Sequence, residues 1–435
     1  YYSNLSYTFD RKYTLNASWR IDESNVFGRD KSAQNRPVYS VGAMWALGRE
    51  EFMNNVSWVN RLNVRLTYGI TGNAPVVGTG SSYDILQSES NFNYVTGAGY
   101  IIVSPGNAKL TWEGTRVYNF GLDFAVLNNR LSGSIETYVR KTTDLIGDLR
   151  ITPFTGYDRV TGNYGDMENK GIEIGLNSVN VRSGHFSWTS SFTFSHNKNK
   201  LIKLEENAPT TGASLVSTTR MVGYPLHTQF AYNYGGLNAV GDPQIILADK
   251  SVSAALNIAT PDDILYMGTR QPVWSGGFQN TFTYKSLTLS ASIVYNGGHK
   301  IRSNRNPTFN EQILGNNSLQ LGFFDRWKTA DDAGKTEIPR YIADPGVAAG
   351  RSLSYYLSSN RFILNGAYAK LRDITLGYSL PRNMVSKLNA ESVSFRFQLN
   401  NLLLWKANDH GMDPEFTGTT RNAQGTFSLG AHISF

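Results

Sequence analysis

The side chains that could carry chemistry are few and widely spaced in this 435-residue sequence. Six histidines occur, but they form no HExxH motif and no two are three or four residues apart. A helix-borne zinc site is therefore not expected, and His185 and His432 fit the polar side of predicted strands. Cysteine is absent, which removes disulfides, cysteine-based zinc sites and thiol catalysis. No local nucleophile motif accompanies the histidines, so we predict no catalytic residues and no enzyme.

Adjacent carboxylates are the second candidate for chemistry. The pairs Glu205-Glu206, Asp262-Asp263 and Asp331-Asp332 lie in predicted long loops. Hard cations prefer clustered loop oxygens, so a loop Ca²⁺ site is one interpretation and a solvated loop is the other. Gly78-Thr79-Gly80 lacks the strand-turn-helix context of a phosphate loop. Apart from that loop Ca²⁺, the sequence predicts no cofactor and no resident metal.

Charge and hydropathy exclude two classes of protein. A net charge of +7 spread over 435 residues is too dilute for nucleic-acid binding, which needs lysine and arginine gathered on one element. The longest unbroken apolar run extends only from Ala43 to Leu47. A spanning helix needs ~20 consecutive apolar residues, so a helical membrane protein is not expected.

Period-two alternation dominates the sequence. Near the C-terminus, polar or small residues separate Phe427, Leu429, Ala431, Ile433 and Phe435. The same alternation is found at 13–21, 62–70, 186–194 and 393–399. Alternation of this kind predicts a sheet with one apolar face and one polar face. Such a sheet fits either a soluble sandwich or barrel with an apolar interior, or a membrane barrel with an apolar exterior.

Three features favour the membrane barrel. The alternating segments run about 9–12 residues, the length that a tilted strand needs to cross a bilayer. The polar face carries Arg20, Arg65 and Arg396 in mid-strand, which suits a water-filled interior. Aromatic residues gather near the strand ends, as interfacial girdles require, and the last strand ends at Phe435. We therefore predict an all-β fold, a transmembrane antiparallel β-barrel with about 13–14 strands in this chain and outer-membrane lipid around it.

The expected strands alternate between tight turns and long connections. Strands are predicted at 1–9, 12–21, 37–47, 61–71, 116–127, 130–141, 168–180, 184–197, 272–285, 287–297, 367–380, 391–402 and 425–435. The long loops are predicted at 72–115, 142–167, 198–271, 298–366 and 403–424, with 226–236 placed inside a loop. Bacterial barrels have even strand numbers and start in the periplasm, so we expect 1–435 to be part of a longer barrel.

Tyrosines in these loops are the candidates for substrate binding. Tyr83, Tyr94, Tyr355 and Tyr356 lie among serine, asparagine and glycine. Flat rings beside adaptable polar groups suit sugars and peptides alike. The alternative interpretation is ordinary turn chemistry together with girdle aromatics.

Several strings resemble, in order, those of the SusC/RagA family of TonB-dependent transporters. The first are Trp45 followed by Glu50-Glu51-Phe52, and 62–73, which contains Arg65 and Gly69. The stretch 163–174 resembles the family's "N.G.m.NkGvE" and contains Asn169, Gly171 and Glu173. The next matches are Pro272 with 276–280, and Trp327 with Ile338-Pro339-Arg340. The stretch 367–381 also matches, and it contains Arg372, Gly377, Tyr378 and Pro381. The last matches are Asn400-Asn401-Leu402 and Asp413-Pro414-Glu415, and the chain then ends at Phe435.

This resemblance implies a plugged barrel of about 22 strands in the outer membrane of a Gram-negative bacterium, with 1–435 as its C-terminal part. It implies that the plug domain and the first strands are absent from this chain. It also implies a SusD-like surface lipoprotein as lid, and energy from TonB-ExbB-ExbD through the N-terminal part. The implied function is active import of an oligomeric nutrient, a glycan or a peptide. An outer-membrane enzyme or secretion-associated barrel, and a passive porin, are the alternatives.

Overall fold

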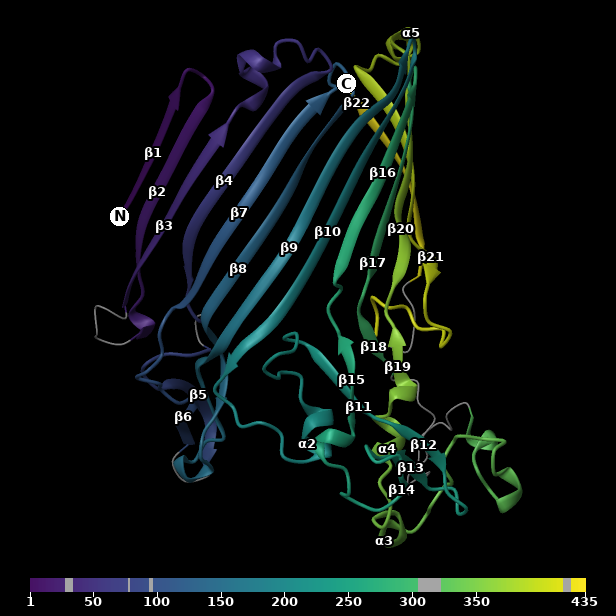
Figure 1. The fold of residues 1–435 in the computed structure, drawn as a ribbon. Helices are drawn as coiled ribbons and strands as arrows, with labels where there is room; N and C mark the ends of the chain where they lie inside the picture. The colour runs from purple at the N-terminus through teal and green to yellow at the C-terminus, as the bar shows by residue number, and fades with distance from the viewer. Residues whose placement is uncertain (28–33, 77–78, 94–96, 304–321, 418–423) are drawn as a thin grey trace. The chain divides into compact units, whose positions relative to one another are not determined.

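The computed structural model describes residues 1–27, 34–76, 79–93, 97–303, 322–417 and 424–435. Thirteen strands are hydrogen-bonded in the order β1-β2-β3-β4-β7-β8-β9-β10-β16-β17-β20-β21-β22, and the pairings described between them are antiparallel (Figure 1). They are β1 (Tyr2–Phe9), β2 (Tyr13–Glu23), β3 (Asn35–Trp45), β4 (Val59–Asn73), β7 (Glu113–Val126), β8 (Leu131–Arg150), β9 (Arg159–Ser183), β10 (Phe186–Leu204), β16 (Trp274–Tyr284), β17 (Leu287–Gly297), β20 (Tyr368–Ser379), β21 (Ser392–Lys406) and β22 (Thr426–Ser434). The prediction of an antiparallel sheet with this number of strands is confirmed.

The chain divides into two compact units. The first contains Tyr1–Asn207, Val222–Tyr224 and Gly277–Lys285, and the second contains Ala208–Met221, Pro225–Gly276 and Ser286–Phe435. Within the first unit, tight turns at one end join β1 to β2, β7 to β8 and β9 to β10, and the long connection 74–112 joins β4 to β7 at the other end (Figure 1). Among the described residues, no helix is both long and apolar enough to cross a membrane.

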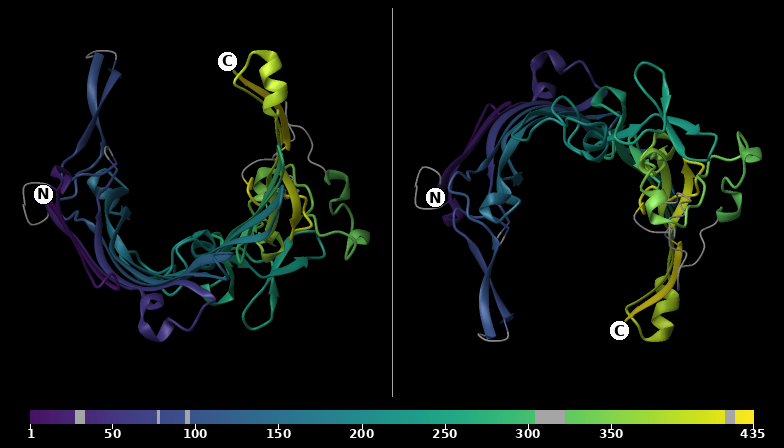
Figure 2. Two further views of the ribbon diagram at one scale, coloured as in Figure 1. Left: turned by 90° about the horizontal axis from the view of Figure 1, so that it is seen from above. Right: turned by 90° about the horizontal axis from the view of Figure 1, so that it is seen from below.

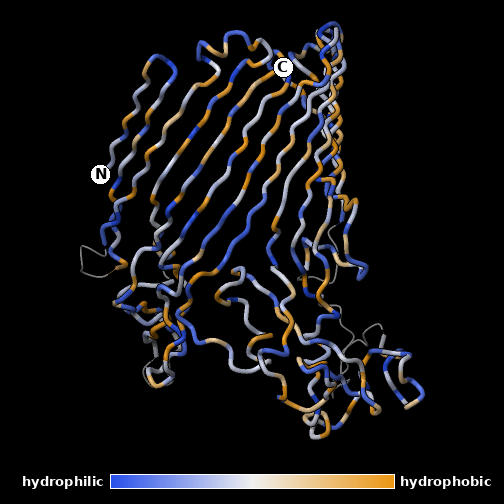
Figure 3. The backbone as a smooth tube through the Cα atoms, viewed as in Figure 1, coloured by the Kyte–Doolittle hydropathy of each residue, from blue (hydrophilic) through white to orange (hydrophobic). Residues whose placement is uncertain are grey.

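One face of the long strands is apolar and exposed. In the first unit Val41 is 46%, Leu66 57% and Phe120 44% exposed, and Leu66 lies directly opposite Phe120. The intervening positions are polar or small, so hydrophilic and hydrophobic residues alternate along these parts of the strands (Figure 3). An apolar face that other protein does not cover is the expected lipid-facing surface of a membrane barrel.

Three strands extend farther than the sequence pattern predicted. β8, β9 and β10 contain 20, 25 and 19 residues, and Leu145–Arg150 pairs with Arg159–Gly165. The predicted loop 142–167 is therefore wrong, since only 151–158 connects the two strands. At ~3.3 Å per residue these strands are longer than a bilayer crossing needs. The ends of β8 and β10 continue the hydrogen-bonded ladder without the regular alternation of apolar and polar residues on which the prediction depended.

The long connections carry small folded structures of their own. In the first unit β5 (Ile85–Asn93) and β6 (Gly97–Ser104) form a hairpin that extends away from the long strands (Figure 2). The second unit contains β11 (Thr228–Tyr232), β12 (Tyr234–Leu237), β13 (Pro243–Ile246), β14 (Val252–Ser253), β15 (Ile264–Thr269), β18 (Lys300–Arg302), β19 (Ile363–Asn365), α2 (Gly212–Ser217), α3 (Pro345–Ala348), α4 (Ser354–Leu357) and α5 (Arg382–Val385). Residues 226–236 lie in such a connection, as predicted, where they supply β11 and part of β12.

The connections of the second unit have their own apolar cores. Tyr232, Ile245, Ala259 and Tyr355 form one buried cluster, and Ile301, Leu364 and Met412 form another. β11 pairs with β15, and β18 pairs with β19. These small sheets position the side chains of the site described next.

Candidate functional site

A buried charge network ties β20 to the connection that follows β21. Successive residues of a strand point to opposite faces, so Tyr368, Lys370 and Arg372 share one face of β20. Lys370 Nζ lies 3.0 Å from Asp413 Oδ2 and 2.7 Å from Glu415 Oε2, and the Lys370 and Asp413 side chains are each 1% exposed. Two cations and two carboxylates meet here, because Arg372 Nη2 also donates to Glu415 Oε1 at 2.7 Å. The network is balanced in charge.

The connection itself is shaped by Asn408 so that its carboxylates face β20. Asn408 Nδ2 donates to the Met412 carbonyl, and the Met412 amide donates back to Asn408 Oδ1. Burial alone would raise the pKa of the Glu415 carboxyl, but hydrogen bonds from Lys370, Arg372 and Tyr368 lower this pKa to about 2. Glu415 is therefore fully ionised at neutral pH and holds its three donors.

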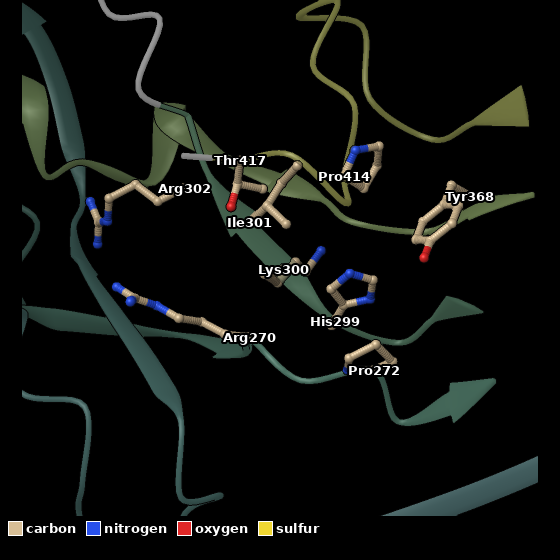
Figure 4. A pocket seen from close by; sticks show the side chains of 9 residues that line it. All are labelled: Arg270, Pro272, His299, Lys300, Ile301, Arg302, Tyr368, Pro414 and Thr417. Atoms are coloured by element: carbon tan, nitrogen blue, oxygen red, sulfur yellow. The ribbon is translucent and has the colours of Figure 1, made fainter. Parts of the chain in front are cut away.

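Next to this network lies a cavity of about 330 Å³ (Figure 4). Pro272, Ile301, Pro414 and the ring of Tyr368 form its apolar walls. The Tyr368 hydroxyl is already engaged, since it donates to Glu415 Oε1 and accepts from Asn296 Nδ2. The other lining residues are Arg270, His299, Lys300, Arg302 and Thr417.

The polar lining of this cavity is basic. Figure 4 shows the side chains of Arg270 and Arg302 extending the same way, and His299 and Lys300 farther along the cavity. Arg302 Nη2 donates to the Phe230 carbonyl at 2.7 Å, whereas its Nη1 is buried with no partner in the described part of the chain. Burial, and then the neighbouring Arg270 charge, lower the pKa of Arg302. We call Arg270, Lys300 and Arg302 the cationic pocket.

His299 and Gln229 complete the surroundings of the cationic pocket. His299 is 4% exposed, and burial lowers the pKa of its imidazole, so the ring is neutral at pH 7. Gln229 on β11 donates to the Lys300 carbonyl at 2.7 Å and holds β18 in place. His299 Nδ1 and Gln229 Oε1 are buried and have no hydrogen-bond partner among the residues described.

The first unit contains a second charged cluster, on the polar face of its strands. Arg65 on β4 donates from Nε to Asp123 Oδ2 and from Nη2 to Glu136 Oε1, each at 2.7 Å. Asn119 Nδ2 also donates to Glu136, at 3.1 Å. Arg65 was predicted as a family-motif position, and the structure places it between two carboxylates on adjacent strands.

The other motif residues of the first unit lie where strands and turns need them. Trp45 Nε1 donates to Glu50 Oε1 at 2.8 Å across the turn after β3, and donors from Tyr13 and Trp45 lower the pKa of Glu50. A Cβ on Gly171 would lie 2.5 Å from the Tyr138 hydroxyl oxygen, and one on Gly69 would lie 3.2 Å from Ser40 Cβ. Asn169 and Glu173 lie on β9 on either side of Gly171, and Asn169 Oδ1 accepts from Asn197 at 3.4 Å.

In the second unit, Arg340 binds Asp242 through two parallel hydrogen bonds of 2.8 Å. Gly241, the neighbour of Asp242, has φ +81° and lies against the Trp327 ring, and Pro339 is buried. Arg372 and Asp413 belong to the buried network, and Pro414 lines the cavity. Four motif residues lie elsewhere, with Gly377 and Tyr378 on β20, Pro381 directly before α5 and Phe435 following β22.

The four predicted loop tyrosines are not brought together. Tyr83 is 52% exposed, and Tyr94 lies outside the described residues. Tyr355 and Tyr356 are only 2% and 1% exposed because their rings pack against Tyr232 and Tyr234. A substrate-binding role stays a prediction for all four tyrosines. The rings of Tyr355 and Tyr356 are buried inside the second unit.

The acidic pairs mostly have local structural partners. Asp263 accepts from the Ala248 and Thr260 amides, and Asp332 accepts from the Lys328 and Thr329 amides. No group of three or more histidine or acidic side chains that could hold a metal is found among the described residues. A loop Ca²⁺ site stays a prediction without a defined set of ligands.

Sequence reasoning missed the cationic pocket. Its cations are supplied by two separate connections, and none of the three cations belongs to a family string. A signal was present, since the stretch 264–303 contains Arg270, Lys300 and Arg302 but no aspartate or glutamate. The alternation of Lys300 and Arg302 places both on one side of β18, beside the end of β15.

Comparisons with known proteins match the whole chain. Residues 1–257 match the family model described as "TonB dependent receptor-like, beta-barrel". TonB-dependent receptor P26 of Formosa agariphila is 27% identical over 99% of this chain and 44% of its own length. TonB-dependent receptor SusC of Bacteroides thetaiotaomicron is 26% identical over 100% of this chain and 43% of its own length.

Solved structures agree on the fold. The structure described as the RagAB peptide transporter matches with a TM-score of 0.81 and 23% identity, covering 100% of this chain and 47% of that chain. The "open-open" state of the RagAB peptide importer matches with a TM-score of 0.78 and 24% identity. The chain thus spans less than half the length of the relatives that it matches.

Proposed function

Because the chain belongs to the TonB-dependent receptor-like β-barrel family, we propose that it is part of an outer-membrane transporter for active import of an oligomeric nutrient, a glycan or a peptide. The carrying observation is the antiparallel sheet of 13 long strands with one exposed apolar face, combined with the family match over residues 1–257. Such a sheet is the wall of a barrel in the outer membrane of a Gram-negative bacterium.

Two kinds of relative support import over passive diffusion. SusC is named as a TonB-dependent receptor, and RagAB is described as a peptide importer. Energy from TonB-ExbB-ExbD would reach the substrate through a plug domain outside these 435 residues, with this chain as the C-terminal part of the barrel wall. The relatives are named as receptors and transporters, which favours transport over an outer-membrane enzyme, a secretion-associated barrel or a passive porin.

The folded connections support a lid partner. The segments 74–112, 205–273 and 298–367 carry small sheets and buried cores outside the 13-stranded sheet. The described parts of these segments give folded surfaces that a SusD-like lipoprotein could contact. We propose that such a lipoprotein binds here and holds the oligomer between itself and the barrel.

Affinity purification of the native receptor from outer membranes tests the partner. A tag on the chromosomal copy allows mild detergent extraction, and mass spectrometry identifies what co-purifies. We expect a surface lipoprotein in equimolar amount together with bound oligosaccharides or peptides. Recovery of the receptor alone after chemical cross-linking of intact cells would overturn the lid proposal.

A further inference from the structure

The cationic pocket is unusual because its charges are not balanced. Arg270, Lys300 and Arg302 line one cavity, and none of them has a carboxylate partner among the described residues. The nearby carboxylates Asp413 and Glu415 are already neutralised by Lys370 and Arg372. Lys300 and Arg302 are half-buried, and like charges that are partly withdrawn from water repel each other, so this arrangement lowers the stability of the empty pocket.

Arg302 is held ready to bind an anion. One nitrogen of its guanidinium is fixed by the Phe230 carbonyl, and the other, Nη1, is buried without a partner in the described chain. A guanidinium offers a rigid fork of donors that matches the oxygen atoms of carboxylates and phosphates. Because Arg302 is already oriented, it would lose little side-chain freedom when an anion binds.

The shape of the cavity limits what can enter. A volume of about 330 Å³ is at the small end of the range for ligand pockets. It accommodates one residue or one sugar unit and not a whole oligomer. The apolar walls formed by Pro272, Ile301 and the Tyr368 ring would pack against the carbon skeleton of that unit, while the cations face its charged group.

We propose that the cationic pocket binds one oxyanion group of the imported oligomer, either a carboxylate or a sulfate or phosphate ester. The identity of the oligomer as an imported substrate rests on the proposed function, whereas oxyanion binding by the pocket does not. A neutral glycan or peptide would leave Arg302 Nη1 without its partner and would bind more weakly.

Calorimetric titration of the purified full-length receptor in detergent tests this directly. The probes are triglutamate against triglutamine, trigalacturonate against maltotriose, and inorganic sulfate and phosphate alone. We expect tighter binding of at least one anionic oligomer than of its neutral counterpart, with an affinity that falls as salt rises. The anionic probe that binds distinguishes a peptide carboxylate from a sugar carboxylate.

Variants assign the binding to the pocket. Arg270 is exposed, so Arg270→Gln leaves the fold intact, and Arg302→Gln removes the buried donor. Loss of a charged hydrogen bond predicts roughly tenfold to hundredfold weaker binding of the anionic oligomer in either variant. Arg382→Gln is the matched control, because Arg382 is an exposed arginine of the same unit outside the cavity. It should bind like the wild type.

Three results would overturn the proposal: equal affinity for charged and neutral oligomers, wild-type binding by Arg270→Gln, or binding of inorganic sulfate or phosphate only. The third would assign a structural anion site.

Uptake by cells separates the two proposals. Anionic oligomers that bind but are never imported would contradict the proposed function alone, and import that is indifferent to charge and to Arg270→Gln would contradict the pocket alone.

Discussion

Lys370 Nζ lies 3.0 Å from Asp413 Oδ2, and both side chains are 1% exposed. This ion pair, together with Glu415, joins a barrel strand to the connection beside the cationic pocket. Its two members come from motifs that are about forty residues apart in the sequence and that meet only in the folded chain.

We expect Lys370→Met to destabilise the protein, because it leaves the buried Asp413 carboxylate without a cation and removes one of the two cations that bind the half-buried Glu415. Breaking a buried pair in this way costs about 3–5 kcal/mol. Urea unfolding of the receptor in detergent micelles, followed by tryptophan fluorescence, measures the change. Lys141→Met is the control, since the Lys141 side chain is 59% exposed and 3.9 Å from Glu168. If Lys370→Met lowered the free energy of unfolding by less than about 1 kcal/mol, a structural role for the pair would be contradicted.

Acid should weaken the fold through Glu415. Its pKa is lowered from 4.5 to about 2 in the folded state, so the folded carboxyl stays ionised where the unfolded one takes up a proton. The stabilisation is therefore complete above pH about 4.5 and is lost as the pH falls toward 2. Glu415→Gln should flatten the dependence of unfolding free energy on pH across this window. Glu391→Gln, at an exposed residue of the same unit, should keep the wild-type slope.

Gly171 should not tolerate alanine, whereas Gly377 should. A Cβ on Gly171 would come within 2.5 Å of the Tyr138 hydroxyl oxygen and 2.7 Å of the His196 carbonyl, but one on Gly377 would meet nothing closer than 3.9 Å. Overpacking of this kind costs about 1–3 kcal/mol. Thermal unfolding monitored by gel mobility of the folded band compares Gly171→Ala with Gly377→Ala. Equal melting temperatures would show that Tyr138 moves aside without cost.

A charge on the apolar face of β22 should destabilise the barrel in lipid. Leu429 is 79% exposed and lies opposite Phe397, so both belong to the lipid-facing surface. Leu429→Arg should cost up to about 2–4 kcal/mol, depending on its depth in the bilayer. Ser428→Arg on the opposite face is the matched control. Reversible unfolding in phospholipid vesicles provides the measurement, and equal effects of the two variants would contradict the assignment of faces.

The positions of the long strands were predictable because each has one apolar face. At 62–70 and 393–399 the residues alternate because one side of the strand faces lipid and the other side faces water. This pattern can be recognised within a single strand. The extensions Thr142–Arg150 and Arg159–Met167 were missed because outside the membrane neither face needs to be apolar. These two extensions form strands because they pair with each other, and the sequence of either one alone does not show that pairing.

The site was less predictable than the fold. Asp413 and Arg372 were identified through family strings, but their meeting with Lys370 is a tertiary contact. Tyr355 and Tyr356 were predicted to bind substrate because they lie in a loop among polar residues, and their rings are buried because this connection forms its own core. The three cations of the cationic pocket come from two connections and belong to no family string, so only the folded chain brings them together.

The most direct test of the account is the uptake of oligomers by living cells. Cells with the native receptor, a deletion strain and cells treated with a protonophore are given a casein digest and partial hydrolysates of plant polysaccharides, and depletion of each oligomer from the medium is followed by mass spectrometry. Import predicts that a defined set of oligomers disappears only with the receptor and an intact proton gradient. Depletion at the same rate in all three cultures, or uptake that survives loss of the gradient, would contradict active import.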